Sequence, residues 1–145
     1  MIFDADRIAT QLGLQPHPEG GRFREYWRSD QTVSRTDGAT RSVATAIHFL
    51  LGSDDRSQWH TVRSDELWLW QGGGAIDLRL GGSGATPSTS PESVLLGPDI
   101  DAGQALTVLV PAGTWQSAQP VDGPVLVSCV VAPGFDFEDF RLLGD

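Results

Sequence analysis

The sequence contains no lysine, because all ten of its basic residues are arginines. This absence excludes Schiff-base chemistry, pyridoxal phosphate attachment and the lysine of a phosphate-binding loop. Cys129 is the single cysteine, so neither an intrachain disulfide nor a cysteine-rich zinc site is expected. The chain lacks a run of about 18 apolar residues, which argues against a membrane helix. Its N-terminal residues do not show a basic segment followed by an apolar run, which argues against a secretory signal. We therefore expect a cytoplasmic protein.

Basic residues are scarce relative to acidic ones. Ten arginines stand against 19 aspartates and glutamates, which gives a formal net charge of -9. Such a chain repels phosphate backbones and anionic membrane surfaces, so we expect neither nucleic acid nor membrane as a partner. A chain of 145 residues is long enough to bury its own core, and we expect residues 1–145 to form a single domain.

Glycine and proline punctuate the chain. The 17 glycines and 9 prolines favour strands and turns over helices. One short helix is predicted over residues 4–14, with Asp4 as the N-cap and Gly13 as the stop. A turn follows at 16–21, and residues 81–93 read as a surface loop. About ten short strands are expected, which indicates a sandwich or barrel; they are 22–28, 43–51, 58–62, 66–71, 75–80, 94–96, 105–110, 114–118, 125–131 and 140–143.

The candidate chemistry centres on one of the three histidines. A lone histidine in a strand more often has a structural role than a ligand-binding one. His60 differs because a turn at 63–65 joins its strand to the strand that carries Glu66, and such a hairpin can bring both side chains to one face. The segment VPAGTWQS at 110–117 predicts a tight turn into a strand, which can place Gln116 on an inner face.

Five segments carry a resemblance to a known family: PHPEGG at 16–21, TAIHFLL at 45–51, WHTVRSDE at 59–66, PAGTWQ at 111–116 and VAPGFDFEDF at 131–140. In these motifs the chain resembles the cupin superfamily, in particular a subfamily of unknown function. The resemblance implies an all-β double-stranded β-helix, a jelly-roll barrel, with a ligand cavity inside and a short N-terminal helix before it. It also implies dimerisation, and we expect a homodimer that uses the strand at 22–28.

The same resemblance bears on metal binding. A typical metal cupin uses two histidines, a glutamate and a third histidine. Here Val62 and Gln116 occupy two of the histidine positions, which leaves His60 and Glu66 with one weak amide. Transition metals prefer imidazole, and a catalytic zinc usually has three protein ligands. We therefore expect no cofactor; the alternative is a divalent metal held by His60, Glu66 and Gln116, with His48 as a further candidate whose orientation stays open.

The preferred functional hypothesis is a small-molecule-binding cupin that acts as a metal-independent isomerase or epimerase. His60 would be the general base, because imidazole titrates near working pH, and Glu66 would orient its ring. Tyr26 would be the partner acid, while Arg22 or Arg24 would hold a carboxylate or phosphate. An aromatic cavity wall is expected, with the ligand-binding candidates Trp59, Trp68, Trp70, Trp115, His48 and Gln116.

Two alternatives from other classes stay open: a non-catalytic binding cupin whose metal site has decayed, and a metal-dependent cupin enzyme. The PHPEGG turn has two interpretations as well. We favour a stiff connector, in which the prolines fix φ and the glycine pair allows a tight reversal of the chain. The functional interpretation places His17 or Glu19 at the cavity mouth. The phenylalanines of the last motif are expected to seal a barrel end; they are Phe135, Phe137 and Phe140.

Overall fold

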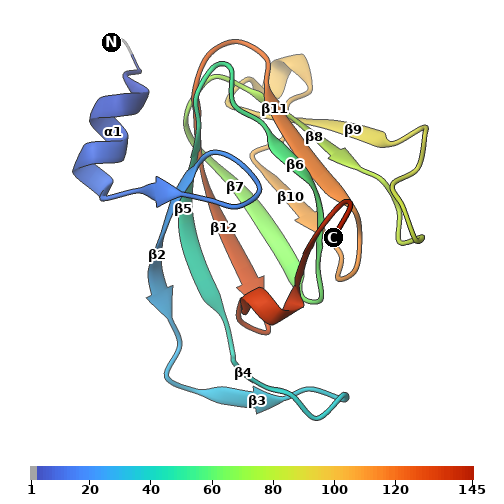
Figure 1. Ribbon diagram of the computed structural model, residues 1–145. Helices are drawn as coiled ribbons and strands as arrows, with labels where there is room; N and C mark the ends of the chain where they lie inside the picture. The colour runs from blue at the N-terminus through green and yellow to red at the C-terminus, as the bar shows by residue number, and fades with distance from the viewer. Residues whose placement is uncertain (1–2) are drawn as a thin grey trace.

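Two antiparallel sheets form the protein in a computed structural model that describes residues 3–145 (Figure 1). The six-stranded sheet has the order β1 (Gln15–Pro16), β2 (Arg22–Arg28), β5 (Thr45–Leu51), β12 (Val125–Ala132), β7 (Asp65–Gly73), β10 (Thr107–Val110). The five-stranded sheet has the order β13 (Phe140–Leu142), β6 (Ser57–Val62), β11 (Gln116–Pro120), β8 (Ile76–Leu80), β9 (Glu92–Leu96). A separate hairpin pairs β3 (Thr32–Ser34) with β4 (Thr40–Ser42). The all-β jelly-roll barrel that the sequence predicted is confirmed.

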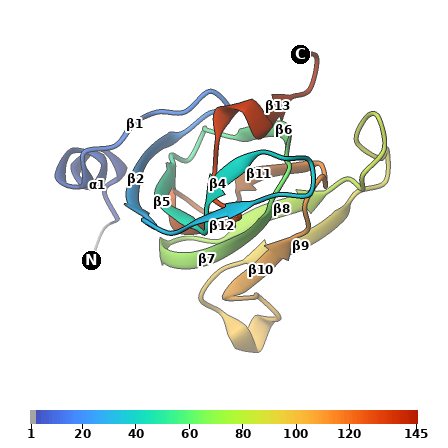
Figure 2. The same cartoon turned by 90° about the horizontal axis from the view of Figure 1, so that it is seen from below.

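The N-terminal helix α1 (Ala5–Leu12) begins and ends where its local signals indicate. The Asp4 carboxylate accepts a hydrogen bond from the Arg7 backbone N–H at 3.2 Å, which satisfies one of the free donors of the first turn. Gly13 ends the helix at φ +67°, a conformation that glycine adopts without strain. The helix packs outside the six-stranded sheet against Leu50 (Figure 2). It is too short to cross a membrane, and it is the only α-helix within residues 3–145.

The core fills the space between the two sheets. Phe49 and Trp68 come from the six-stranded sheet, Ile76 and Leu78 from the other, and all four are almost completely buried. Most strands lie within a few residues of their predicted bounds. The strand predicted at 66–71 is longer in the structure, because Gly72 and Gly73 still belong to β7. Figure 2 shows strands of both sheets surrounding the barrel interior, and two short 3-10 helices, η1 (Ile100–Ala102) and η2 (Phe137–Asp139), complete the elements.

A β-bulge in β2 changes which side chains face the barrel interior. Glu25 pairs with Ile47 and Trp27 pairs with Ala46, which is adjacent to Ile47 in β5. Tyr26 is therefore an extra residue without a partner. A bulge shifts the alternation of every residue after it. Simple alternation along residues 22–28 would place Arg28 on the same face as Tyr26. Arg28 instead shares the inner face with Glu25.

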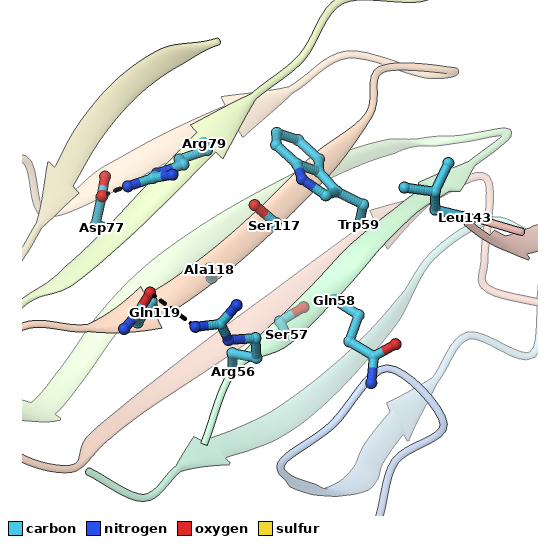
Figure 3. A pocket seen from close by; sticks show the side chains of 10 residues that line it. All are labelled: Arg56, Ser57, Gln58, Trp59, Asp77, Arg79, Ser117, Ala118, Gln119 and Leu143. Carbon is cyan, nitrogen blue, oxygen red and sulfur yellow. Dashed lines mark hydrogen bonds and ion pairs between the residues drawn. The ribbon is translucent and has the colours of Figure 1, made fainter. Parts of the chain in front are cut away.

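A second bulge lies in β6. His60 pairs with Gln116 and Ser57 pairs with Ala118, so Gln58 and Trp59 together oppose a single residue of β11. Ser57 and His60 are both buried on the inner side, although three positions separate them. The side chains of Gln58 and Trp59 both point to the outer face of the sheet (Figure 3). This bulge therefore shapes both sides of the barrel wall.

Candidate functional site

A cavity of about 340 Å³ is lined by side chains of the barrel strands and by Phe137 of η2, and Figure 1 shows η2 at one end of the barrel. One part of its wall is polar, with side chains from the 16–21 turn, β2, β6 and β7; the other part is apolar. The lining residues are His17, Glu19, Phe23, Glu25, Arg28, Thr45, Ile47, His60, Val62, Glu66, Val131, Phe135, Asp136, Phe137 and Phe140. A concave space with an apolar wall and a few convergent polar groups is typical of a small-molecule site.

The segment that carries the phenylalanines is held in place by a buried ion-pair network. Asp139 follows Phe137 closely, and its carboxylate accepts hydrogen bonds from Arg35 at 2.7 Å and Arg41 at 2.9 Å. Both arginines belong to the β3–β4 hairpin region, so the network ties this hairpin to η2. The arginines hold the pKa of Asp139 below its ordinary value. The three phenylalanines that were expected to seal a barrel end form part of the cavity wall.

His60 and Glu19 form the centre of the polar wall. The Nδ1 atom of His60 lies 2.7 Å from the carbonyl oxygen of Gln58. A carbonyl only accepts, so Nδ1 carries the hydrogen and Nε2 of the neutral ring is an acceptor. That Nε2 lies 3.2 Å from Oε2 of Glu19. A proton held between these two acceptors satisfies both of them, so we assign one shared proton to the pair.

Burial decides where that proton resides. Glu19 is enclosed by the protein, which disfavours its charged form and raises its pKa to about 8, although a hydrogen bond from the Ser57 hydroxyl opposes the shift. Burial also lowers the pKa of His60. At neutral pH the proton therefore belongs mainly to Glu19, whose carboxyl donates to His60.

His17 completes this corner, with its Nδ1 at 3.3 Å from Oε1 of Glu19. Its Nδ1 accepts a hydrogen bond from the Glu19 backbone N–H at 3.1 Å, which places its own ring hydrogen on Nε2. Its ring packs against Phe23 at 4.5 Å and Phe140 at 5.7 Å between centroids. Burial and the neighbouring His60 lower the pKa of His17 to about 4. His17 is thus a neutral ring at physiological pH.

Glu66 is the second buried carboxyl of the cavity. Its Oε1 accepts a hydrogen bond from Gln116 Nε2 at 3.0 Å, and Gln116 Oε1 accepts from the Trp68 indole N–H at 2.9 Å. This chain fixes the orientation of the Gln116 amide and hence of the carboxyl. Burial, then the charge of Glu19, raises the pKa of Glu66 to about 7. The Cys129 thiol beside it is buried, as expected, with its pKa raised by burial and by Glu66.

The cavity presents no free positive charge among the described residues. Arg28 is its one arginine, and its Nε lies 2.7 Å from a carboxylate oxygen of Glu25. The same guanidinium donates to the Phe135 carbonyl at 3.0 Å. Since both lining histidines are neutral at pH 7, the polar wall consists of acids and neutral rings. An anionic ligand would find no counter-charge here.

The structure brings only some of the predicted site residues to the cavity. His60 and Glu66 line it, and Gln116 lies directly behind Glu66. The ring of His60 is oriented by the Gln58 carbonyl and Glu19, so the orienting role expected for Glu66 is corrected.

Four other candidates lie on the opposite face of the six-stranded sheet. Tyr26 stacks on His48 at 4.3 Å between ring centroids, and its hydroxyl lies 2.7 Å from that of Ser128. Arg24 donates to the Leu12 carbonyl at 3.3 Å, and Arg22 lies 3.3 Å from Asp6. None of these four lines the cavity, because they project from the outer side of β2 and β5. The structure therefore corrects the expected arrangement in which Tyr26 faces His60 across a substrate.

The tryptophans also differ from the expected aromatic wall. Trp68 shares the inner side with Glu66, as expected, but it is buried in the core behind the cavity. The indole N–H groups of Trp70 and Trp115 donate to the carbonyls of Gly74 and Gly84, and neither ring lines the cavity. Trp59 points outward. The aromatic part of the wall consists of phenylalanines instead.

Sequence analysis favoured a connector role for the PHPEGG turn over a place at the cavity mouth, yet Glu19 lies in the polar wall of the site. The turn is held against β6: the Gln58 backbone N–H donates to the Glu19 carbonyl at 2.7 Å. Gly20 adopts φ +112° and packs against the Arg56 carbonyl so closely that a side chain there would clash. A glycine pair directly after a glutamate was the signal of such a close approach.

The donor set does not fit the four-ligand metal site of the fold family. Within residues 3–145 no group of three or more histidine, cysteine, aspartate or glutamate side chains is arranged to hold a metal ion. Both ring nitrogens of His60 have partners, and Gln116 Oε1 accepts from Trp68. Val62 contributes only a methyl surface, and His48 lies on the far side of the sheet. We derive no chemical step through a metal.

Comparison with known proteins identifies the family. Residues 6–143 match the family described as "Cupin superfamily (DUF985)", and the chain therefore belongs to this family. A hypothetical protein from Leishmania major is 31% identical, with a TM-score of 0.87 over 96% of this chain and 86% of that one. Protein SO0799 from Shewanella oneidensis is 31% identical, with a TM-score of 0.86 over 98% of this chain and 85% of that one. Protein YML079W from Saccharomyces cerevisiae is 29% identical over 94% of this chain and 74% of its own length.

Proposed function

We propose that this cupin binds a small uncharged carbonyl compound in the cavity and moves a proton at the carbon next to the carbonyl. The protein would then be a metal-independent isomerase or epimerase. One observation carries the proposal: Glu66 and the Glu19–His60 pair, two acid–base centres with shifted pKa values, line the same small cavity. Buried groups whose pKa values are moved towards neutrality are a frequent sign of acid–base catalysis.

Glu66 is suited to accept the proton. A general base works best when its pKa lies near the working pH, and the pKa of Glu66 is about 7. The Gln116 amide holds the carboxylate in one orientation, so its free oxygen needs little reorganisation. This assignment differs from the sequence-based one, in which His60 was the base, because Nε2 of His60 already accepts from Glu19.

The Glu19–His60 pair is suited to supply a proton. Glu19 stays protonated up to a pH of about 8, so it can donate to a substrate carbonyl oxygen at neutral pH. His60 accepts from the same carboxyl and can hold the proton as it moves. In the proposed step Glu66 removes the carbon-bound proton, the C–H electron pair becomes the C=C bond of an enol, and the carbonyl oxygen takes the acid's proton. Reprotonation at another carbon gives isomerisation, and at the other face epimerisation.

The substrate is proposed to be uncharged because the polar wall offers acids and neutral rings. An anionic substrate would lie among Glu19, Glu66 and Asp136 with Arg28 already neutralised by Glu25. The phenylalanine side would take the apolar part of the molecule. The cavity volume of about 340 Å³ limits the substrate to a small organic compound.

The test is proton exchange in heavy water. Purified protein is incubated with a set of small hydroxy-ketones and hydroxy-aldehydes, and deuterium at the carbon next to the carbonyl is followed by NMR. We expect exchange with at least one compound, and its loss in Glu66→Gln by about 100-fold or more. Glu92→Gln, an exposed carboxyl on β9, is the control and should keep the full rate. Binding without exchange for every compound would instead favour the non-catalytic cupin.

A further inference from the structure

The outer face of the five-stranded sheet carries a second hollow, distinct from the cavity inside the barrel. This groove has a volume of about 280 Å³ (Figure 3). Its floor is Ser117 and Ala118 of β11, and side chains from β6 and β8 border it. The proposed function does not use this groove, and the inference below is independent of it.

Trp59 stands beside the groove because of the bulge in β6. The bulge turns Gln58 and Trp59 to the same outer side of the sheet. The edge of the indole ring packs against Gly81 so closely that a Cβ there would lie 3.0 Å from Cζ3. Unlike the indoles of Trp68, Trp70 and Trp115, that of Trp59 donates no hydrogen bond to residues 3–145. It is a positioned aromatic surface with an unused donor.

The groove also gathers positive charge in a chain that is strongly acidic overall. Arg56 and Arg79 border it, against one carboxylate, that of Asp77. Arg79 Nε lies 3.1 Å from the Asp77 carboxylate, so this pair is largely neutral. Arg56 has no carboxylate within ion-pair distance among the described residues, and its closest polar partner is the Gln119 amide oxygen at 3.5 Å. Its donors are therefore available for a ligand.

We propose that the outer groove binds a flat ring that carries one anionic oxyacid group. The ring would lie against Trp59, and the carboxylate or phosphate would accept hydrogen bonds from Arg56, with Gln119 beside it. In Figure 3 the indole and the Arg56 guanidinium lie on two sides of the groove, with Ser117 and Ala118 between them. A guanidinium binds oxyacids through paired N–H groups, and indole faces accept planar rings. The small floor residues leave room for such a ring.

The test uses phenyl phosphate, benzoate and uncharged phenol as probes. Each is titrated into 15N-labelled protein while the five tryptophan indole signals are followed by NMR; the Trp59→Phe variant assigns the signal. We expect a saturable shift of the Trp59 signal with phenyl phosphate or benzoate, and the stronger of the two identifies the preferred oxyacid. The Trp27 indole on the other sheet should stay unmoved. Loss of a charge-assisted hydrogen bond predicts that Arg56→Gln weakens binding by about tenfold or more.

Arg63→Gln is the matched control, because it removes the same charge from an exposed arginine outside the groove. It should leave the affinity within about twofold of the parent, an effect expected from screened long-range charge alone. The proposal is overturned if the Trp59 signal does not move, if phenol binds as tightly as the anions, or if both arginine variants weaken binding equally. Unchanged positions of the other four indole signals in each variant show that the fold is intact.

Discussion

His60 Nε2 lies 3.2 Å from Glu19 Oε2, and the opposite ring nitrogen of His60 donates to the Gln58 carbonyl. The geometry therefore requires one proton between a neutral imidazole and a carboxyl group. Because both groups are buried, a carboxylate at Glu19 or an imidazolium at His60 would be costly. The shared proton keeps both groups neutral. This arrangement has measurable consequences for how stability depends on pH.

Glu19 should make the protein less stable as pH rises through neutrality. Its pKa is about 8 when folded, against 4.5 ordinarily, so between these values the folded protein holds the extra proton. Free energy of unfolding then falls as pH rises. His17 has the opposite effect, since its pKa falls from 6.5 to about 4, but that effect ends near pH 6.5. Above pH 6.5 the buried carboxyls therefore determine how the free energy of unfolding changes with pH.

The Glu19→Gln variant removes this titration while its amide can still donate to His60. Between pH 6.5 and 8 we expect the parent to lose about 2 kcal/mol of unfolding free energy through Glu19, and the variant to lose much less. Urea denaturation at both pH values measures this. Glu92→Gln is the control and should keep the parental slope. Equal slopes for Glu19→Gln and the parent would show that Glu19 is ionised throughout.

Much of the fold was predictable because its signals are local. Asp4 and Gly13 bound the helix through contacts within a few residues, and β2 has the bounds that its alternation indicated. The family motifs added the jelly-roll barrel. The part of the site that involves His60 and Glu66 followed from the hairpin that joins their strands.

The remainder of the site depends on features that the regular alternation of side chains along a strand does not reveal. The bulge at Tyr26 exchanges the faces of the residues after it and brings Arg28 inward. The bulge in β6 sends Trp59 outward while His60 stays inside. Glu19 reaches the centre only because its turn packs on β6, a contact between segments nearly 40 residues apart. Tertiary packing determines the positions of these bulges and of the turn.

Gln116 should matter for stability and for the titration of Glu66. It is buried, donates to Glu66 and accepts from Trp68. Gln116→Leu leaves the buried indole N–H of Trp68 without a partner and removes one hydrogen bond from the buried Glu66 carboxyl, so we expect a loss of about 1–3 kcal/mol. Because the lost hydrogen bond holds the pKa of Glu66 down, that pKa should rise in the variant.

Urea denaturation measures the loss of stability, and 13C NMR of the glutamate carboxyls measures the titration. Gln71→Leu on the same β7 strand as Glu66 is the control, since this glutamine is exposed. It should change neither quantity appreciably. A Gln116→Leu protein with parental stability would show that the buried hydrogen-bond chain contributes little.

We also propose a homodimer that uses β2. The two-residue β1 pairs only with Arg22 and Phe23, so the edge of the rest of β2 has no partner strand in the described chain. Tyr26 and Trp27 on this strand are 48% and 49% exposed. An open edge with exposed aromatics favours pairing with a second copy.

Light scattering at micromolar protein should give twice the monomer mass of 15.6 kDa. Trp27→Glu should shift the protein towards monomer, because it places a charge in the proposed interface. Ile100→Glu, at the exposed η1, adds the same charge elsewhere and should leave the dimer intact. A parent protein that is monomeric under these conditions would contradict the proposal.

Restoring imidazoles should build a metal site where the parent lacks a fitting donor set. Gln116 pairs with His60 across β6 and β11 and contacts Glu66, while Val62 lines the same cavity. In the double variant Val62→His, Gln116→His, these positions join His60 and Glu66. Without metal we expect a loss of about 1–3 kcal/mol, and nickel or zinc at a hundredfold excess over its dissociation constant should return about 2.7 kcal/mol. Thermal melting of both proteins with and without metal measures this. If the parent gains as much as the variant, the native residues already bind metal; if neither gains, the four side chains do not converge.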